Sequence, residues 1–220
     1  MKSHPFDTSR LRCSASRTLT LGALLLLSAC TVLPRAEPVD TYLLPSASLS
    51  RAPGQTTLPL SLRVSRPLGG VQLTGQRIVV VPEDNRVSVY KGANWSDPAP
   101  VLVRDRILEA FRVDARIAAL SSDEQRLHAD FELVSELQAF QSEYRDAAPE
   151  VVVRIDARLI QRDGRRILAS RVFESRLRPA GAELVQVVAS FGQASTAVAS
   201  EMVGWVVQVL EPCATTGCPK

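Results

Sequence analysis

Residues 127–139 (LHADFELVSELQA) and 151–159 (VVVRIDARL) decide the fold, because apolar and polar side chains alternate along both stretches. In a strand, successive side chains point to opposite faces, so each stretch predicts a strand with one apolar face. His128 falls on the charged face of the first stretch, which we expect to meet water. The dipeptide at 163–164 (DG) is typical of a tight turn and leads into a further strand at 167–177. These segments predict a long antiparallel hairpin with a third strand beside it.

Three shorter strands are predicted upstream of this hairpin. Residues 60–65 alternate apolar and polar side chains, as a half-buried strand does. Residues 77–81 are β-branched and apolar, and a polar run at 83–85 separates them from another apolar strand at 87–90. The spacing of the last two strands favours a second hairpin.

Two helices are predicted, one before and one after the long hairpin. Asp97 provides an N-cap and Pro98 a first turn for a helix that runs to about Val113. Its expected buried face consists of Val103, Ile107 and Phe111. The last helix carries its buried residues at steps of three and four, namely Leu184, Val188, Phe191, Ser195, Val198, Met202, Trp205 and Val209. This order predicts an α+β fold: a single domain over 60–211 with a largely antiparallel sheet and two main helices packed on one face, then a tail at 212–220.

The N-terminus has the pattern of a bacterial lipoprotein signal peptide. Four basic residues come before an uncharged, leucine-rich run at 18–27, which leads into 27–30 (LSAC). About ten apolar residues suit the core of a signal peptide and fall short of the roughly 20 that span a bilayer. Small residues at 28–29 give a peptidase access to the backbone. We therefore expect residues 1–29 to be a signal peptide and Cys30 to be lipidated; a plain secretory signal with a chance cysteine is the alternative.

Lipidation would hold the mature chain on a membrane. Two or three acyl chains, at roughly 0.8 kcal/mol per buried methylene, bind almost irreversibly, whereas a single chain binds only marginally. The residue after Cys30 is Thr31 rather than an aspartate. By analogy with the sorting of lipoproteins in enteric bacteria, this favours the periplasmic face of the outer membrane.

The formal net charge of +3 belongs to the signal peptide. Residues 1–29 hold four of the 26 basic and one of the 23 acidic side chains, so 22 of each sign remain after cleavage. Proteins bind nucleic acids largely because clustered Lys and Arg side chains displace counterions from the phosphate backbone, and the neutral mature chain has no dense basic run of this kind. We therefore expect no nucleic-acid partner.

Residues 30–59 are predicted to form the lipidated N-terminus and a flexible tether. This segment is rich in Pro, Ser, Ala and Thr, and a chain of that composition is extended and poorly packed. Within it, 42–45 (YLLP) is more apolar than the rest. This piece is either a first edge strand or a docking element.

Two cysteines remain near the C-terminus once Cys13 leaves with the signal and Cys30 is lipidated. Cys213 and Cys218 are close in sequence, and in an oxidising periplasm they can close a small disulfide loop. Two free thiols are a second interpretation. A zinc site is a third, but it needs two more ligands, and His128 is the one histidine left after cleavage. The sequence thus favours a disulfide and no metal.

Little in the sequence supports catalysis. It contains no G-x-S-x-G, H-E-x-x-H or C-x-x-C motif and no glycine-rich phosphate loop. Acidic pairs such as 123–124 are typical of loops. We expect neither an enzyme nor a cofactor.

The remaining distinctive residues are aromatic. Trp205 lies on the apolar face of the last helix and is expected in the core. Tyr90 and Trp95 flank the loop before the first helix, where they either cap the sheet or contact a partner.

Several short motifs, in a fixed order, make the chain resemble a known family. After the lipoprotein signal come 42–45 (YLLP), the strand 77–82 (RIVVVP), 89–90 (VY) and 94–100 (NWSDPAP), which leads into a helix. The chain looks like an ABC-transport auxiliary lipoprotein of the PqiC-like family, and the likeness covers most of residues 40–210. The two cysteines of the C-terminal tail depart from the family's pattern.

The resemblance implies a non-catalytic lipoprotein of an MCE-type system, in which an inner-membrane ABC permease with its ATPase and a periplasmic MCE-domain protein move lipids between membranes. The lipoprotein would dock the MCE assembly from the outer membrane, with Tyr42, Tyr90 and Trp95 as expected partner contacts. A homo-oligomer is compatible with this role. Two alternatives stay open: a lipid-binding carrier with a pocket between helix and sheet, and a structural envelope lipoprotein without a role in transport.

Overall fold

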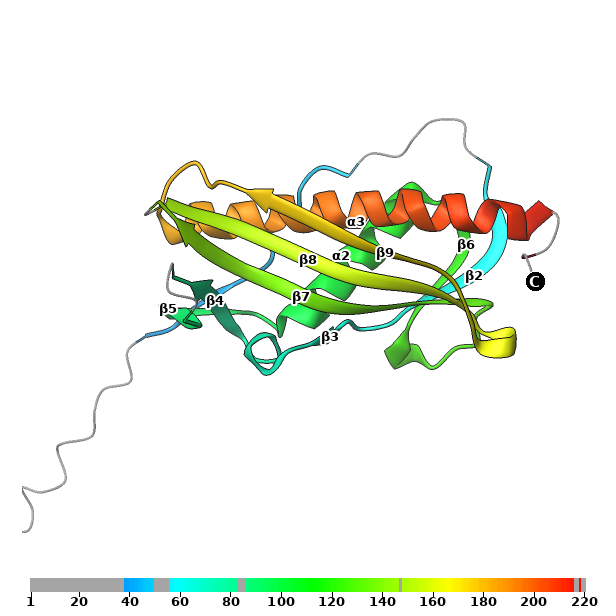
Figure 1. Cartoon of the computed structure of the whole chain (residues 1–220), viewed down its shortest axis with the longest axis horizontal. Helices are drawn as coiled ribbons and strands as arrows, with labels where there is room; N and C mark the ends of the chain where they lie inside the picture. The colour runs from blue at the N-terminus through cyan, green and yellow to red at the C-terminus, as the bar shows by residue number, and fades with distance from the viewer. Residues whose placement is uncertain (1–37, 50–55, 83–85, 147, 216–217, 219–220) are drawn as a thin grey trace, which may run out of the picture. The chain divides into compact units, whose positions relative to one another are not determined.

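The computed structural model describes residues 38–49, 56–82, 86–146, 148–215 and 218. Within these residues the chain forms one sheet of nine strands and two long helices (Figure 1). The strands are β1 (Asp40–Tyr42), β2 (Leu58–Val64), β3 (Leu68–Gly69), β4 (Arg77–Val81), β5 (Ser88–Trp95), β6 (Ile117–Ser122), β7 (Phe131–Arg145), β8 (Ala148–Gln161) and β9 (Arg166–Leu177). The helices are α2 (Ala99–Asp114) and α3 (Leu184–Thr215), and the short 3₁₀ turns are η2 (Val71–Leu73), η3 (Asp123–Gln125) and η4 (Asp163–Arg165). The predicted α+β fold class is confirmed.

β7 is the central strand of the sheet. One edge of β7 pairs antiparallel with β8 along its whole length, from Phe131 opposite Gln161 to Arg145 opposite Ala148. β8 in turn pairs antiparallel with β9. The turn between them contains Gly164 at a φ of 76°, a left-handed conformation that glycine adopts without strain. The predicted long hairpin, its tight turn and the third strand beside it are confirmed.

The other edge of β7 differs from the prediction. β2, β3 and β4 pair with this edge one after another, and all three run parallel to β7. β2 also runs parallel to β6, and β1 runs parallel to β5. The sheet is therefore mixed rather than purely antiparallel: its longest pairings, β7 with β8 and β8 with β9, are antiparallel as predicted, whereas the parallel neighbours of β7 were not predicted. Alternating side chains indicate a strand but carry no information on its direction, and the chain between β2 and β7 supplies the crossover that parallel neighbours need.

A β-bulge shifts the alternation in the middle of β7. The pairing with β8 skips Gln138, which is the additional residue. Upstream of the bulge Leu137 is buried, and downstream Phe140 takes the core-facing position that strict alternation gives to Ala139. Leu127 lies before β7 and is 55% exposed, so its predicted place on the buried face is wrong.

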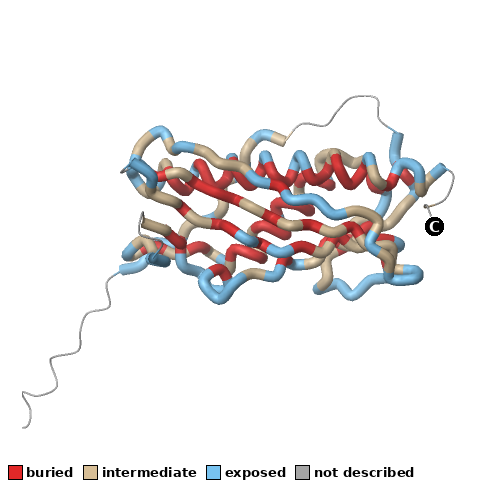
Figure 2. The backbone as a smooth tube through the Cα atoms, viewed as in Figure 1, coloured by how far each residue is buried: buried red, intermediate tan, exposed pale blue. Residues whose placement is uncertain are grey.

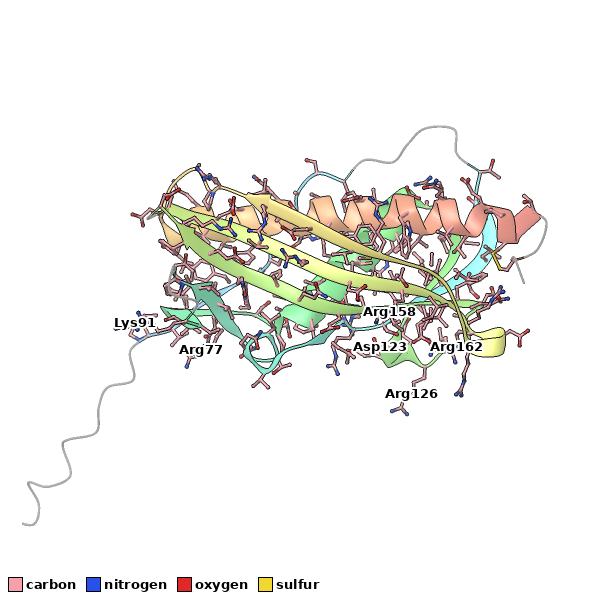
Figure 3. The ribbon with its side chains drawn as sticks, viewed as in Figure 1. Arg77, Lys91, Asp123, Arg126, Arg158 and Arg162 are labelled. Atoms are coloured by element: carbon pink, nitrogen blue, oxygen red, sulfur yellow. A yellow bond between two sulfur atoms is a disulfide. The ribbon has the colours of Figure 1, made fainter. Side chains whose placement is uncertain are left out.

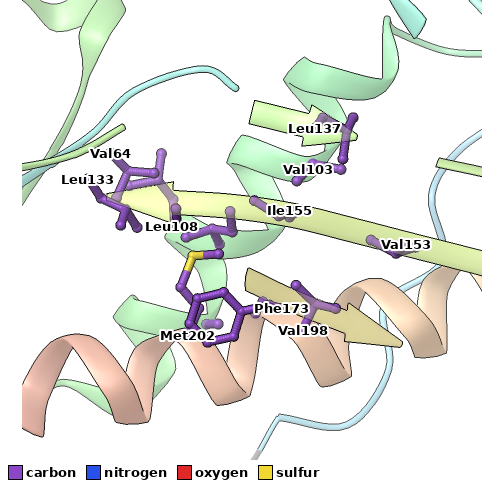
Figure 4. Close-up of a cluster of buried hydrophobic side chains, with 14 of the residues drawn as sticks. Val64, Val103, Leu108, Leu133, Leu137, Val153, Ile155, Phe173, Val198 and Met202 are labelled. Atoms are coloured by element: carbon purple, nitrogen blue, oxygen red, sulfur yellow. The ribbon is translucent and has the colours of Figure 1, made fainter. Parts of the chain in front are cut away.

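α3 lies along β8 and β9 and buries one face of the sheet (Figures 1 and 2). Six of its eight predicted core residues are buried, namely Val188, Phe191, Ser195, Val198, Met202 and Trp205, and Leu184 and Val209 are half-buried. Figure 4 shows Val198 and Met202 beside Phe173 of β9. α3 has 32 residues and ends at Thr215, so it runs into the segment 212–220 that was predicted as a tail. No helix in the described part of the chain is both long enough and apolar enough to cross a bilayer.

α2 matches the predicted first helix and packs against α3 and β6. Its expected face is buried, as Val103, Ile107 and Phe111 show. The predicted N-cap is wrong: Pro98 holds the N-cap position instead of Asp97, and no side chain caps the helix. The backbone itself supplies the first bonds, because the Pro98 carbonyl accepts from the amides of Val101 and Leu102.

β6 was not predicted from the sequence. Its residues, 117–122 (IAALSS), place two exposed alanines side by side, so apolar and polar side chains do not alternate. Among the described strands β6 pairs with β2 alone, so one row of backbone bonds and the burial of Ile117 hold it in the sheet.

We expect replacement of Phe140 by alanine to lower the free energy of unfolding by about 3–5 kcal/mol, since it removes a fully buried aromatic side chain. The matched control is Val185→Ala, which shortens an exposed side chain of α3 and should change stability by less than about 0.5 kcal/mol. Urea unfolding followed by circular dichroism measures both. Equal stabilities of the two variants would contradict the core position of Phe140.

Candidate functional site

The N-terminal segment Val39–Leu49, called the strap below, is attached to the sheet. β1 pairs parallel with β5, with Asp40 opposite Ala93 and Tyr42 opposite Trp95. The amide of Ser96 also donates to the carbonyl of Tyr42 at 2.8 Å. Of the two interpretations of the YLLP segment, the structure shows the edge strand, although this segment lies within the range predicted as a tether.

Arg106 of α2 holds the strap where it leaves β1. Its guanidinium Nη2 donates to the carbonyl of Pro45 at 2.6 Å and to that of Leu44 at 3.2 Å, and Nη1 pairs with Glu109 at 3.0 Å. The Arg106 side chain is only 4% exposed. A buried guanidinium without acceptors is costly, so the strap carbonyls stabilise Arg106 as much as Arg106 holds the strap.

Gly192 brings α3 into direct contact with the same part of the strap. A Cβ atom at this position would lie 2.5 Å from the carbonyl oxygen of Pro45 and 3.1 Å from its Cβ. No side chain fits there without moving the strap or the helix. The strap is therefore held by an edge strand, a buried arginine and a close backbone approach.

Trp95 lies beneath the strap, in the core. Its side chain is 1% exposed, and its ring meets those of Phe140 and Phe191 edge-on, with centroids 5.6 and 5.2 Å apart. Such contacts stabilise the core, but they leave no surface for a partner. Of the two interpretations of Trp95, packing against the sheet and contact with a partner, its burial fits the first and leaves no exposed surface for the second.

Tyr42 and Tyr90 are half-buried beside this cluster. The hydroxyl of Tyr90 donates to Ser142 Oγ at 3.2 Å, and burial raises the pKa of Tyr90 to about 12. Tyr42 lies opposite Trp95 in the register of β1 and β5, whereas Tyr90 lies five residues before Trp95 on β5 and bonds to β7 instead.

Sequence reasoning missed Arg106 and Gly192. A glycine inside a helix costs about 1 kcal/mol relative to alanine, so Gly192 could have indicated a close packing contact. An arginine on an apolar helical face is buried only when hydrogen-bond acceptors reach it, so Arg106 could have indicated such acceptors. The acceptors come from Leu44 and Pro45, which are more than 60 residues away in sequence. This separation is why the arginine alone did not reveal them.

The sheet face away from α3 is charged. Arg176 of β9 pairs with Glu143 at 3.0 Å, with Glu150 at 3.2 Å and with Glu174. Burial acts to lower the pKa of Arg176, but these carboxylates outweigh burial and raise it. A surface pocket of about 610 Å³ borders this cluster, with Gln141 and Arg145 in its wall. Paired charges of this kind keep the face wet and contribute little to stability.

A second surface pocket, of about 660 Å³, lies at the opposite end of β7 and contains the C-terminal cysteines. A disulfide joins Cys213 to Cys218. His128 is exposed at the rim, as expected, next to Asp130. Within the described residues no three His, Cys, Asp or Glu side chains are arranged to hold a metal ion.

Asp130 has an unusually well-bonded carboxylate. Its Oδ2 accepts from Ser61 Oγ at 2.6 Å and from the Ser61 amide at 2.8 Å. These bonds favour the charged form and lower the pKa of Asp130 below its ordinary value. The pair ties β2 to the start of β7.

Comparison with known proteins identifies the relatives of this fold. Residues 42–203 match the model of the family described as ABC-type transport auxiliary lipoprotein component. The uncharacterized protein bll6063 of Bradyrhizobium diazoefficiens is 28% identical over 156 residues, which is 70% of this chain. The chain spans only 41% of the length of that relative.

Two solved structures support the fold. Protein XCC0632 from Xanthomonas campestris superimposes with a TM-score of 0.75 at 26% identity, covering 81% of this chain and 100% of its own. The hypothetical protein CT253 from Chlamydia trachomatis gives a TM-score of 0.51 at 8% identity, covering 70% of this chain and 99% of its own. The second likeness shows the architecture alone.

We expect Gly192→Ala to loosen the strap and Gly204→Ala to stabilise the domain. Alanine in a helix is favoured over glycine by about 0.5–1 kcal/mol, and a Cβ at Gly204 meets nothing within 4 Å. At Gly192 this gain is lost against the carbonyl of Pro45. The midpoint temperature of thermal unfolding should therefore rise for Gly204→Ala only. Hydrogen exchange of the Ser96 amide should accelerate for Gly192→Ala only. The same response in both variants would show that the strap does not rest on α3.

We expect Ser61→Ala to raise the pKa of Asp130 and to make the domain less stable at neutral pH. The folded-state pKa is lowered, so its contribution to stability is present above the unfolded value of about 3.9 and is lost as pH falls through the folded value. The stability gap between the native protein and Ser61→Ala should shrink from pH 7 to about pH 2. Carboxyl NMR and urea unfolding measure this, with Asp130→Asn as the control that removes the titration. A gap independent of pH would contradict the assignment.

Proposed function

Because this chain belongs to the family of ABC-type transport auxiliary lipoprotein components, we propose that it is the membrane-anchored, non-catalytic adaptor of an ABC-type transport system. In this proposal, acyl chains on Cys30 hold the protein at the periplasmic face of the outer membrane. The folded domain docks a periplasmic MCE-domain protein, and a permease with its ATPase in the inner membrane supplies the energy for moving lipid.

The strap is the observation that carries this proposal. The chain that leads from Cys30 enters the folded domain at β1, where pairing with β5, the Arg106 guanidinium and the contact at Gly192 fix it. An adaptor needs such a fixed attachment, because a partner that pulls on the domain also pulls on the anchor. A free carrier has no need to secure its N-terminus in this way.

Packing between the helices and the sheet favours docking over carriage of lipid. The layer between α3 and the sheet is filled by large side chains that are less than 2% exposed, among them Trp95, Phe140, Phe173, Phe191 and Ile155. The pockets of about 610 and 660 Å³ are open and mostly polar in their lining. An acyl chain needs an apolar cavity, so these features support an adaptor whose cargo travels elsewhere.

Tyr42 and Tyr90 remain the proposed contacts for the partner. Each keeps part of its ring exposed at the end of the sheet where the strap begins. Tyrosine suits such a role because it offers a large apolar surface together with a hydroxyl. Trp95 lies opposite Tyr42 in the register of β1 and β5 and is itself buried.

The test is affinity purification of the tagged full-length protein from crosslinked cells. We expect an MCE-domain protein and its permease and ATPase to be recovered, with several-fold lower yield for Cys30→Ala, which cannot be acylated. Cys13→Ala is the matched control, since it removes a cysteine of the signal peptide and keeps Cys30. Equal recovery from all three proteins would contradict the role of the anchor. Recovery of phospholipid without protein partners, by native mass spectrometry of delipidated protein, would favour a carrier instead.

A further inference from the structure

The most exposed large apolar side chain in the described residues is in the turn between β3 and β4. Val71 is 91% exposed, and Leu68, just before it, is 76% exposed. Leu68 and Val71 are three positions apart, so one short segment exposes more apolar surface than a single scattered side chain does. The segment Ser65–Arg77, called the η2 turn below, is therefore a candidate contact surface.

The η2 turn is held in a fixed shape. Leu73 is 1% exposed and anchors the turn in the core, and its amide donates to the carbonyl of Gly70 at 2.8 Å. The Thr74 hydroxyl donates to the carbonyl of Val71 at 2.9 Å. Val71 is thus presented to solvent by a bonded turn rather than by a loose loop.

The charge of the η2 turn is positive. Between Ser65 and Pro82 the only charged side chains are Arg66 and Arg77, and both are exposed. Figure 3 shows Arg77 and Lys91 on the same side of the domain, away from α3. Exposed apolar side chains beside cations are what an anionic phospholipid surface attracts.

The η2 turn also lies close to the point where the anchor chain enters the domain. Thr41 of β1 and Arg77 of β4 pair with the same residue, Asn94 of β5, from its two sides. Two strand spacings put Thr41 and Arg77 about 10 Å apart. Residues 30–38 extend to at most about 30 Å, so a bilayer that holds Cys30 is within reach of the turn.

We propose that the η2 turn docks on the phospholipid bilayer that carries the Cys30 anchor, with Leu68 and Val71 entering the interface and Arg66 and Arg77 meeting anionic head groups. The inference rests on the lipidation in the proposed function. Two side chains make too small a patch for a stable protein interface, which buries about 1,200 Å² or more. They are enough for a bilayer contact, because the anchor keeps the turn at a high effective concentration beside the lipid.

The experiment uses the full mature lipoprotein in vesicles of phosphatidylethanolamine and phosphatidylglycerol. A fluorophore sensitive to its environment is attached at Gln72→Cys, in the turn, or at Gln193→Cys, an exposed position of α3 on the other side of the domain. Lipids with a quencher near the head group should quench the label at 72 at least threefold more than the label at 193. Replacing Leu68 and Val71 by serine should remove this difference, whereas serine at Ile167 and Val172, exposed apolar residues of β9, should preserve it.

Equal quenching at 72 and 193 in anchored protein overturns the proposal. Shielding of the label at 72 that depends on protein density and not on quencher lipid also overturns it, because a second copy then covers the turn. The mass of the same sample reports the acyl chains on Cys30 independently. If the protein is acylated but the label at 72 is not quenched, the proposed membrane contact is wrong and the proposed anchor stands. If Cys30 carries no acyl chain, both the contact and the anchor are wrong.

Discussion

The long pairing of β7 with β8 is the interaction on which the rest of the structure depends. A strand of 15 residues extends about 50 Å, and its apolar face must be covered along that whole length. α3 has 32 residues, which at 1.5 Å per residue gives about 48 Å. One helix therefore covers the hairpin from end to end. The other edge of β7 is long enough to pair with β2, β3 and β4 in succession, which makes the sheet mixed.

The bulge in β7 links this scaffold to the strap. By skipping Gln138, the strand turns Phe140 toward the core, where its ring meets Trp95 and Phe191. Trp95 in turn pairs with Tyr42 of the strap. The attachment of the anchor chain thus depends on packing around one irregular position of the central strand, and it is built from core residues instead of surface residues.

The sequence was sufficient for the parts of the fold that follow from local periodicity. The hairpin of β7 and β8, the strand β9 and both helices were predicted because their apolar side chains recur at regular steps over ten or more residues. β6 was missed because exposed Ala118 and Ala119 break its alternation. Strand direction was missed because a parallel pair is set by the path of the chain between the two strands, which side-chain patterns do not record.

The candidate site was predicted less well than the fold. Tyr42 does lie opposite Trp95, yet for an aromatic residue an exposed role and a buried one have the same sequence signature. What separates them is the position of the strap, and the strap is held by Arg106 and Gly192 through contacts with Leu44 and Pro45. Contacts between residues so far apart in the sequence leave no periodic pattern of apolar side chains, so these contacts could be identified only from the structure.

The arrangement of these contacts suits an anchored adaptor in mechanical terms. In the proposed adaptor, a force from the anchor would reach the domain at Val39, just before β1 and its pairing with β5. The bonds of Arg106 and the close approach at Gly192 secure the strap beyond β1, at Leu44 and Pro45. Because β5 pairs with β4 and β4 with β7, the load then passes to the strand that holds the sheet together. An attachment of this kind fits the proposed role of a membrane-anchored adaptor better than that of a free carrier.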